Sequence, residues 1–375
     1  MEKTKFPGGK CGNYHQLQFL ESSAKPLSPG ERLRALNRPL LHWYENHARI
    51  LPWRERPEPY RVWISEIMLQ QTRVEAVKPY FERFMKELPT VEALAAVPED
   101  RLMKLWEGLG YYNRARNLQK AARQIVMEFD GRLPADFADL ITLPGIGSYT
   151  AGAIASIAFG QPVPAVDGNV LRVISRVLAS REDILKQTTK TWMEQMLVET
   201  MPKEAASSFN QGLIEIGAMV CVPNGPPKCG ECPLESLCLA RREGILAEIP
   251  VKKRPPRRKV EERTVCLIEY QDQIGIRRRP DSGLLAALYE LPNQLGYLPP
   301  DQLAAAFSLP LSQVAEIEEL PAARHIFSHV EWHMIGYRVI LKQKLPECYI
   351  AVEKQQVKAE YALPNAFSRY TKLIK

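Results

Sequence analysis

Four cysteines lie within eighteen residues of one another, with the spacing C-x7-C-x2-C-x5-C: Cys221, Cys229, Cys232 and Cys238. In a reducing compartment, cysteines this close together are more typical of a metal site than of a set of disulfides. Zinc favours two C-x2-C pairs or mixed cysteine and histidine ligands, whereas this segment holds one C-x2-C pair and no histidine. Uneven spacings suit an iron–sulfur cubane, which four thiolates surround. The spacing favours iron–sulfur over zinc and leaves both open.

The compartment is inferred from the N-terminus, which has basic residues but no apolar core of a signal peptide. We therefore expect a cytoplasmic protein of bacterial type with reduced thiols. Residues 140–160 are uncharged and long enough to span a bilayer, but Pro144 and several glycines argue against a membrane helix. The three remaining cysteines stand apart from the cluster and are not expected to be ligands: Cys11, Cys266 and Cys348.

The pattern along the chain predicts two domains, which 375 residues of 45% hydrophobic composition can support. Residues 1–29 are expected to be a poorly ordered extension. Residues 30–240 read as helical, for example through an apolar stripe at positions 63, 67, 74, 77 and 81. Residues 264–375 mix strand-like segments (264–270 and 333–341) with helix-like segments (299–307 and 366–375). We predict a mainly α first domain and a smaller α+β second domain.

Residues 241–263, rich in Arg, Lys and Pro, read as a basic linker between these domains. Its charges are either solvated or follow the phosphates of a nucleic acid. The net charge of +7 is compatible with a polyanionic partner but does not establish one.

A glycine-rich turn occurs in residues 143–155, which read LPGIGSYTAGAIA. Gly145 and Gly147 allow the backbone to turn tightly and to present N–H groups at the start of a helix. Such groups can bind a DNA phosphate, although two glycines alone are more often only a turn.

Two carboxylates have the pattern of an acid–base pair. Asp167 stands where a helix begins, so we expect an N-cap whose pKa is held down by the helix dipole and by backbone N–H groups. Glu66 follows Trp63 by three residues at the edge of an apolar face. It is either a solvated helix residue or, in a cleft, an acid whose pKa is raised by burial. Cleavage of a glycosidic bond needs one carboxyl group with a raised pKa, which donates a proton, and one with a lowered pKa, which stays ionised.

The cysteine run, following IEIGA, and the glycine turn together resemble the endonuclease III superfamily of helix–hairpin–helix DNA glycosylases. The superfamily has six residues between the first two cysteines, whereas this chain has seven, in a Pro/Gly loop where an insertion costs little. The resemblance implies a [4Fe-4S] cluster on the four cysteines. It also implies that this cluster is structural and DNA-related rather than catalytic.

A narrower resemblance, from about residue 40 to the cysteine loop, is to the MutY family of adenine DNA glycosylases. It is carried by LPWRERPEPYRVWISEIMLQQTRVEAV, WEGLGYYNRARNL, LPGIGSYTAGAI, AVDGNVLRV and FNQGLIEIGAMVC. It implies that Glu66 protonates adenine and that Asp167 stabilises an oxocarbenium ion. Tyr149 stands where bifunctional relatives carry a lysine nucleophile, so a monofunctional enzyme is implied. It further implies an adenine pocket lined by Trp53, Arg54 and Glu215, although Glu215 alone reads equally as a surface residue.

Base excision requires the adenine to leave the stack, and something must fill the gap. By resemblance, Gln71 and Tyr111 insert near the opposite base, with Thr72 and Leu109 beside them. Without the family, Tyr111 reads equally as core packing.

The second domain contains RRRPDSGLLAALYELPNQ, which resembles the Nudix-like domain of the same family. A Nudix hydrolase needs a carboxylate-rich helix for magnesium, and the residues that follow supply none. We therefore predict a recognition module. In FSHVEWH, the residues Phe327, Ser328 and His329 correspond to the family's loop that reads 8-oxoguanine, although His329 alone reads as an ordinary histidine.

The resemblance as a whole implies a monomeric enzyme that binds duplex DNA and excises adenine opposite 8-oxoguanine or guanine, leaving an abasic site. One alternative is a bifunctional glycosylase/lyase of the endonuclease III type, against which Tyr149 and the second domain argue. Another is a catalytically silent iron–sulfur protein that binds DNA or transfers electrons. The presence of both Glu66 and Asp167 argues against it.

Overall fold

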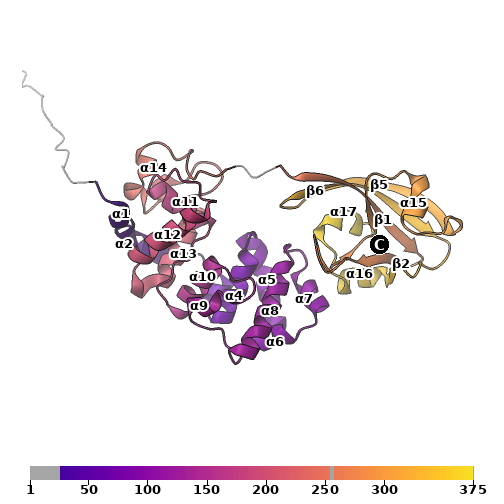
Figure 1. Cartoon of the computed structure of the whole chain (residues 1–375), viewed down its shortest axis with the longest axis horizontal. Coiled ribbons are helices and arrows are strands. Elements are labelled where there is room, and N and C mark those ends of the chain that lie inside the picture. Colours follow the sequence, from indigo (N-terminus) through magenta and orange to yellow (C-terminus); the bar gives the residue numbers. More distant parts are fainter. Residues whose placement is uncertain (1–25, 254–256, 375) are drawn as a thin grey trace, which may run out of the picture.

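The computed structural model describes residues 26–253 and 257–374, and Figure 1 shows the arrangement of the chain. Most of the predicted extension (residues 1–29) and the linker residue Arg254 lie outside the described residues. In the described ranges, no helix has the length and apolar character needed to cross a membrane.

Helices fill the chain as far as Arg242 and form two lobes, each around its own core (Figure 1). One lobe contains α1 (Pro29–Ala35), α2 (Asn37–His47), α11 (Gly168–Val177), α12 (Gln187–Thr200), α13 (Ala206–Met219) and α14 (Leu239–Arg242). The other contains α3 (Pro52–Glu55), α4 (Pro59–Leu69), α5 (Val74–Glu87), α6 (Val91–Ala96), α7 (Glu99–Trp106), α8 (Asn113–Glu128), α9 (Phe137–Leu140) and α10 (Ser148–Phe159). Because the chain crosses between the lobes after α2 and again after α10, residues distant in sequence meet at their junction.

The core of the second lobe is built on large aromatic side chains. Trp63, Phe84 and Trp106 are fully buried, and Phe84 meets Trp106 edge to face at 6.1 Å between ring centroids. Burial of each such side chain stabilises the fold by about 2–3 kcal/mol. The α10 helix packs against both α4 and α13, so it connects the two lobes.

The apolar stripe expected over positions 63–81 falls on two helices, α4 and α5, rather than on one. The break lies at residues 70–73, where Gln71 has a left-handed backbone (φ 58°) that no α-helix can contain. The interruption exposes Gln71 at the surface.

The expected helix starts at Asp167 and after the glycine turn are confirmed. Asp167 caps α11, since its Oδ1 accepts hydrogen bonds from the backbone N–H groups of Asn169 and Val170, both at 2.8 Å. In the turn, Gly145 has φ +79°, and a Cβ there would lie 2.7 Å from Cβ of Asn117. Glycine is therefore required at position 145.

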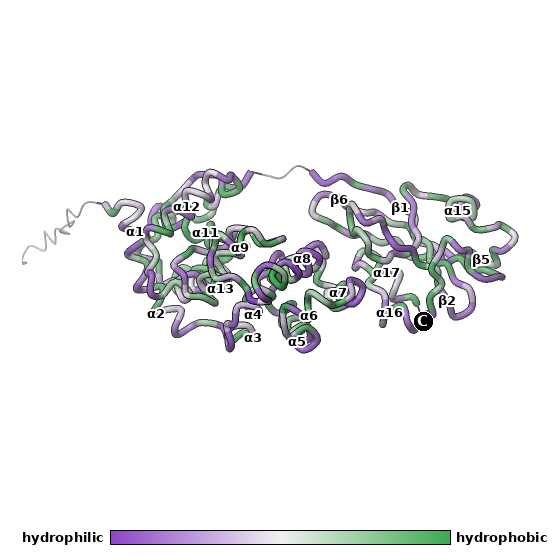
Figure 2. The backbone as a smooth tube through the Cα atoms, turned by 60° about the horizontal axis from the view of Figure 1, so that its bottom comes forward, coloured by the Kyte–Doolittle hydropathy of each residue, from purple (hydrophilic) through white to green (hydrophobic). Residues whose placement is uncertain are grey.

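The second domain is built on a mixed sheet with the strand order β3-β2-β1-β6-β5. β4 and β7 pair with β1 and β2, respectively, and β1 and β6 run parallel. The strands are β1 (Lys259–Tyr270), β2 (Gln273–Arg278), β3 (Tyr289–Glu290), β4 (Asn293–Leu295), β5 (Val314–Ile326), β6 (Val330–Leu341) and β7 (Ile350–Glu353). Both predicted strand segments lie within β1 and β6. Figure 2 shows that the described segments on either side of residues 254–256 are hydrophilic.

Helices cover both faces of this sheet. Along β1, Val265 and Leu267 face one core, with α16 (Lys354–Glu360) and α17 (Ser368–Thr371). The alternating residues Cys266 and Ile268 face the other core, with α15 (Pro300–Ala306). Helix α15 confirms one predicted helix, whereas the predicted C-terminal helix is reduced to a short 3-10 turn and α17.

The two domains are in contact. The helical domain supplies three side chains to backbone groups of the second domain. Lys104 Nζ donates to the carbonyl of Tyr361 (3.1 Å), Glu107 Oε1 accepts from the amide of Leu363 (2.9 Å), and Arg116 donates to the carbonyl of Ala286 (2.5 Å). Leu288 and Ala362 of the second domain also join the core of the adjoining helical lobe.

Candidate active site

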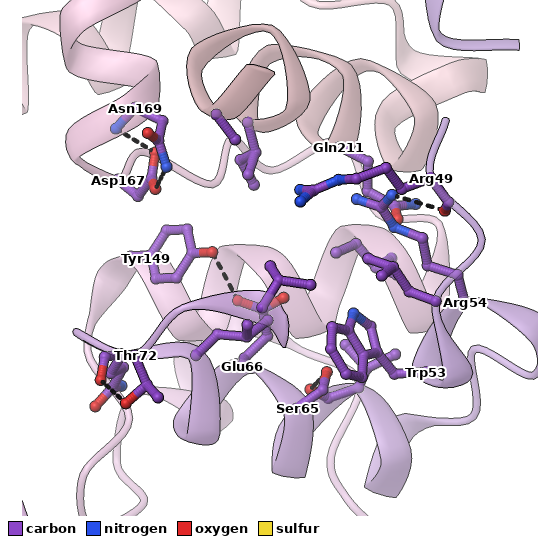
Figure 3. Close-up of a pocket in the computed structure, with 18 of the residues that line it drawn as sticks. Arg49, Trp53, Arg54, Ser65, Glu66, Thr72, Tyr149, Asp167, Asn169 and Gln211 are labelled. Carbon is purple, nitrogen blue, oxygen red and sulfur yellow. Dashed lines mark hydrogen bonds between the residues drawn. The ribbon is translucent and has the colours of Figure 1, made fainter. Parts of the chain in front are cut away.

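A cavity of about 440 Å³ lies at the junction of the two helical lobes, and Figure 3 shows the side chains that line it. This size falls within the range of small-molecule pockets. Among its lining residues are both predicted catalytic carboxylates and five further predicted residues: Glu66, Asp167, Tyr149, Trp53, Arg54, Gln71 and Thr72. The structure therefore brings together carboxylates that stand a hundred residues apart in the chain.

Glu66, on α4, is 7% exposed and is paired with a tyrosine from α10. The hydroxyl of Tyr149 donates a hydrogen bond to Glu66 Oε2 at 2.6 Å (Figure 3). The pKa of Glu66 is raised to about 7: burial is the main cause and the charge of Asp167 adds to it, whereas the Tyr149 hydrogen bond and the charge of Arg54 oppose the rise. The carboxyl group can therefore hold a proton near neutral pH, which agrees with the interpretation of Glu66 as an acid buried in a cleft.

Asp167 lies opposite Glu66 at the N-terminus of α11 (Figure 3). Its Oδ2 accepts a hydrogen bond from Asn169 Nδ2 at 2.7 Å, in addition to the two capping bonds at Oδ1. The expectation of a lowered pKa is wrong in direction, because burial raises the pKa of Asp167 despite these hydrogen bonds and the charge of Arg172. The hydrogen bonds fix the orientation of the carboxylate, but they do not outweigh its removal from water.

Glu215 is fully buried on α13 and lies behind the cavity wall rather than on it. Arg54 NH1 donates to its Oε1 at 2.5 Å, and Arg49 donates to both of its oxygens, with Nε at 3.0 Å from each. Burial alone would raise the Glu215 pKa, but the hydrogen bonds and charges of Arg49 and Arg54 lower it. The alternative interpretation of Glu215 as a surface residue is therefore wrong.

Sequence reasoning missed Arg49, Asn169 and Gln211, all of which line the cavity. Asn169 had a detectable signal, because it stands two residues after the predicted N-cap, within reach of the Asp167 carboxylate. Arg49 had no detectable signal in the sequence, because it lies in an irregular segment after α2, far from its partner Glu215 along the chain.

Trp53 is buried at the edge of the cavity, where its ring meets Phe81 edge to face at 5.4 Å. Arg54 also lies over the ring of Tyr44 at 5.7 Å. Trp53 and Arg54 thus place an apolar wall beside a fixed cation, whereas Glu215, which was also predicted to line the pocket, lies behind that wall.

A second cavity, of about 700 Å³, lies between the two domains and is lined by five of the residues predicted to meet the opposite base. The other two, Gln71 and Thr72, line the first cavity. The helical domain contributes Leu109 and Tyr111, and the second domain contributes Phe327, Ser328 and His329. Tyr111 is 49% exposed, so its interpretation as core packing is wrong. Phe327 is supported from behind by Trp332, with ring centroids 4.9 Å apart.

The four clustered cysteines line one small cavity together with Glu235 and Arg241. In the described residues, no three His, Cys, Asp or Glu side chains are arranged to hold a single metal ion. A cubane cluster differs from a single ion, because its four thiolates surround a shared volume. Arg176 NH1 donates to Cys221 Sγ at 3.1 Å, a contact that suits an anionic sulfur ligand. Cys266 is buried in the second domain and Cys348 is exposed, away from this cavity.

Comparisons with known proteins agree with this architecture. Residues 64–199 match the family described as HhH-GPD superfamily base excision DNA repair protein, and residues 264–373 match the NUDIX domain. Among solved structures, a thermostable thymine-DNA glycosylase matches with a TM-score of 0.52 at 27% identity, covering 56% of this chain and 97% of that one. Endonuclease III in a non-covalent complex with DNA matches with a TM-score of 0.51 at 28% identity, covering 59% and 99%. The fold and the site thus define a helix–hairpin–helix base excision DNA repair glycosylase.

Curated relatives assign the chain to one family within this class of glycosylases. The adenine DNA glycosylase of Rattus norvegicus is 34% identical over 83% of this chain and 72% of its own length. The human enzyme is 33% identical over 91% and 74%. That of Buchnera aphidicola (strain Bp) is 33% identical over 81% and 86%. The chain therefore belongs to the adenine DNA glycosylase family.

Proposed function

We propose that this enzyme excises adenine paired with 8-oxoguanine or with guanine in duplex DNA, and that it leaves an abasic site. The observation that carries the proposal is the cavity in which Glu66, Tyr149 and Asp167 meet. An extruded adenine would enter between the two carboxylates, after leaving the stack at a cost of a few kcal/mol.

Glu66 acts as the general acid. Its Oε2 already accepts the Tyr149 hydrogen bond, so the transferable proton is held on Oε1 and passes to a ring nitrogen of adenine. The bond between C1′ of the sugar and the base then breaks, and its electron pair leaves with the protonated base. A water molecule adds to C1′ and returns a proton to the Glu66 carboxylate.

Asp167 stabilises the cationic sugar formed when the base leaves. Its three hydrogen bonds come from the start of its own helix and hold the carboxylate without neutralising it. Because its charge is buried, the attraction to an oxocarbenium ion is stronger than it would be in water.

Tyr149 occupies the position at which a Schiff-base lysine would be needed, and its hydroxyl is engaged with Glu66. A phenol cannot form an imine with the sugar aldehyde, so strand cleavage by β-elimination is not expected. The reaction therefore ends at the abasic site.

The cavity between the domains supports recognition of the opposite base. Tyr111 enters it from the helical domain, whereas Ser328 and His329 enter it from the second domain. The Ser328 hydroxyl can donate or accept a hydrogen bond at the oxidised edge of 8-oxoguanine. Gln71 fills the stack beside the vacated position.

Two further features support DNA binding. Gly145 and Gly147 expose backbone amides at the start of α10, where a phosphate can bind. The cavity of Cys221, Cys229, Cys232 and Cys238 would hold a [4Fe-4S] cluster, which would stabilise the adjacent loop. Replacing Cys232 by Ser is expected to remove bound iron and sulfide, measured chemically in the purified protein.

The test is single-turnover cleavage of duplexes containing A:8-oxoG, A:G, A:T or thymine glycol:A, each with and without alkali. We expect alkali-dependent cleavage of the adenine strand that is fastest opposite 8-oxoguanine, and no base release by Glu66→Gln despite retained DNA binding. Alkali-independent cleavage at thymine glycol would instead establish a bifunctional lyase. Binding without any base release would establish a catalytically silent protein.

A further inference from the structure

Arg114, the second residue of α8, is a buried cation whose partners come from the end of α4 with the loop that follows it, and from the loop that precedes α8. It is 9% exposed and forms no ion pair in the described part of the chain; its donors go almost entirely to backbone carbonyls. NH1 donates to Ile67 (2.7 Å), Met68 (2.9 Å) and Gln70 (2.7 Å), and NH2 donates to Leu109 (3.2 Å) and Gly110 (3.1 Å).

These acceptors lie on either side of the proposed insertion residues. Ile67 and Met68 lie in the last turn of α4, where carbonyls have no helical partner, and Gln70 immediately precedes Gln71. Leu109 and Gly110 immediately precede Tyr111. One planar guanidinium therefore holds both loops at a fixed separation, which the point charge of a lysine cannot reproduce.

The guanidinium is itself fixed by aromatic rings. It lies 5.3 Å from the centroid of Trp106 and 5.6 Å from that of Tyr111. The indole Nε1 of Trp106 donates to the same Gly110 carbonyl at 3.1 Å. Because Trp106 is fully buried in the lobe core, it ties Arg114 and the Tyr111 loop to the rigid part of the domain.

Both insertion residues have a left-handed backbone, with φ 58° at Gln71 and φ 48° at Tyr111. This conformation is unfavourable for residues other than glycine and persists only where the surroundings impose it. Arg114 contacts the residue before each of them, so it contributes directly to holding these two conformations.

We propose that Arg114 is a positioning residue that sets the Gln71 and Tyr111 loops as one unit, so that both side chains enter the DNA together when adenine is extruded. This inference rests on the proposed function, since it presumes that the two residues insert. Arg114 does not line the cavity of Glu66 and Asp167, so it acts on excision through these two loops.

The experiment is a set of double-mutant cycles that combine Arg114→Lys or Arg114→Gln with Gln71→Ala and with Tyr111→Ala. Single-turnover excision is measured with excess enzyme, and fluorescence of 2-aminopurine at the target position reports extrusion. Arg123→Lys is the matched control, because Arg123 lies on the same helix and donates to a single carbonyl, that of Ala95, at the surface. Thermal unfolding of every variant checks the fold.

We expect the Arg114 variants to lose about tenfold or more in excision, with a parallel loss of 2-aminopurine signal, because small misplacements have effects of this size. Because the two side chains are proposed to act as one unit, the Arg114 substitution should add less in either alanine background than in the wild type. Trp106→Phe, which removes the donor to Gly110 together with part of a buried ring, should show the same pattern in excision, and thermal unfolding measures its separate cost to the core.

Two outcomes would overturn the inference for different reasons. If Gln71→Ala and Tyr111→Ala are both fully active, the insertion roles themselves fail and the inference fails with them. If they are impaired but Arg114→Lys lowers excision by the same factor in every background, Arg114 has a general structural role, and only the inference fails.

Discussion

The hydroxyl of Tyr149 lies 2.6 Å from Oε2 of Glu66 and donates a hydrogen bond to it. The bond favours the ionised form of Glu66, whereas burial and Asp167 favour the protonated form. The tyrosine therefore sets the pH range in which the acid keeps its proton.

Replacement of Tyr149 by Phe should move this range. Without the hydrogen bond the Glu66 pKa should rise by about one unit, because a hydrogen bond to a charged group is worth about that much. Excision depends on protonated Glu66, so the fall in rate at high pH should shift upward in a single-turnover pH profile. Tyr60→Phe is the control, as its hydroxyl bonds only to the Leu88 carbonyl. An unchanged pH profile in Tyr149→Phe would show that Tyr149 does not influence the Glu66 pKa.

Glu66→Gln should change how stability depends on pH. In the folded protein the Glu66 pKa is raised to about 7, so its protonated form contributes stability that is complete below the unfolded pKa near 4.5. That contribution is lost as the pH rises through about 7. The substituted amide carries no titratable proton, so the variant should gain melting temperature relative to the wild type between pH 5 and pH 8. A constant difference across this range would show that Glu66 is not titrating there.

Glu215→Gln should destabilise the fold at the lobe junction. The substitution leaves the charges of Arg49 and Arg54 without their carboxylate, and both arginines are partly exposed, so we expect a loss of about 2–3 kcal/mol. Glu87→Gln is the control, since it breaks an exposed ion pair with Arg101 and should cost under about 1 kcal/mol. Urea unfolding monitored by circular dichroism measures both. Equal losses would show that the buried carboxylate is not needed for stability.

Ser328→Ala should reduce selectivity without abolishing catalysis. Loss of one hydrogen bond to the oxidised base should lower the preference for A:8-oxoG over A:G by about fivefold. The readout is the ratio of dissociation constants, measured with Glu66→Gln also present to prevent turnover. Ser312→Ala, an exposed serine in the turn before β5, should leave this ratio unchanged. If the dissociation constants for the A:8-oxoG and A:G duplexes rise by the same factor, Ser328 does not contribute to the preference for 8-oxoguanine.

Local features of this fold could be predicted because each depends on neighbouring residues. The cap at Asp167, the turn at Gly145 and the strand at 333–341 all follow from chemistry within a few positions. The meeting of Glu66 with Asp167 could not be predicted in this way, because it depends on how two lobes pack. The family resemblance supplied that relationship instead.

The predictions that were wrong also failed because they depend on packing between distant parts of the chain. The Asp167 pKa was expected to fall because its helix cap is visible in the sequence, whereas the burial that reverses the shift is a property of the whole domain. The stripe over positions 63–81 has a helical period throughout, whereas the left-handed backbone of Gln71 divides it between α4 and α5. Arg49 was missed because its partner lies 166 positions away.

The contacts of Lys104, Glu107 and Arg116 with the second domain end on main-chain atoms of Tyr361, Leu363 and Ala286. Main-chain groups are the same whatever side chain they carry, so these contacts make few demands on the residue types of the partner surface. The residue types of the second domain matter mainly where Leu288 and Ala362 pack into the helical lobe. A chimera that preserves the backbone course at these three positions and keeps Leu288 and Ala362 should dock, even when the loop at Phe327–His329 is replaced by one with another base preference.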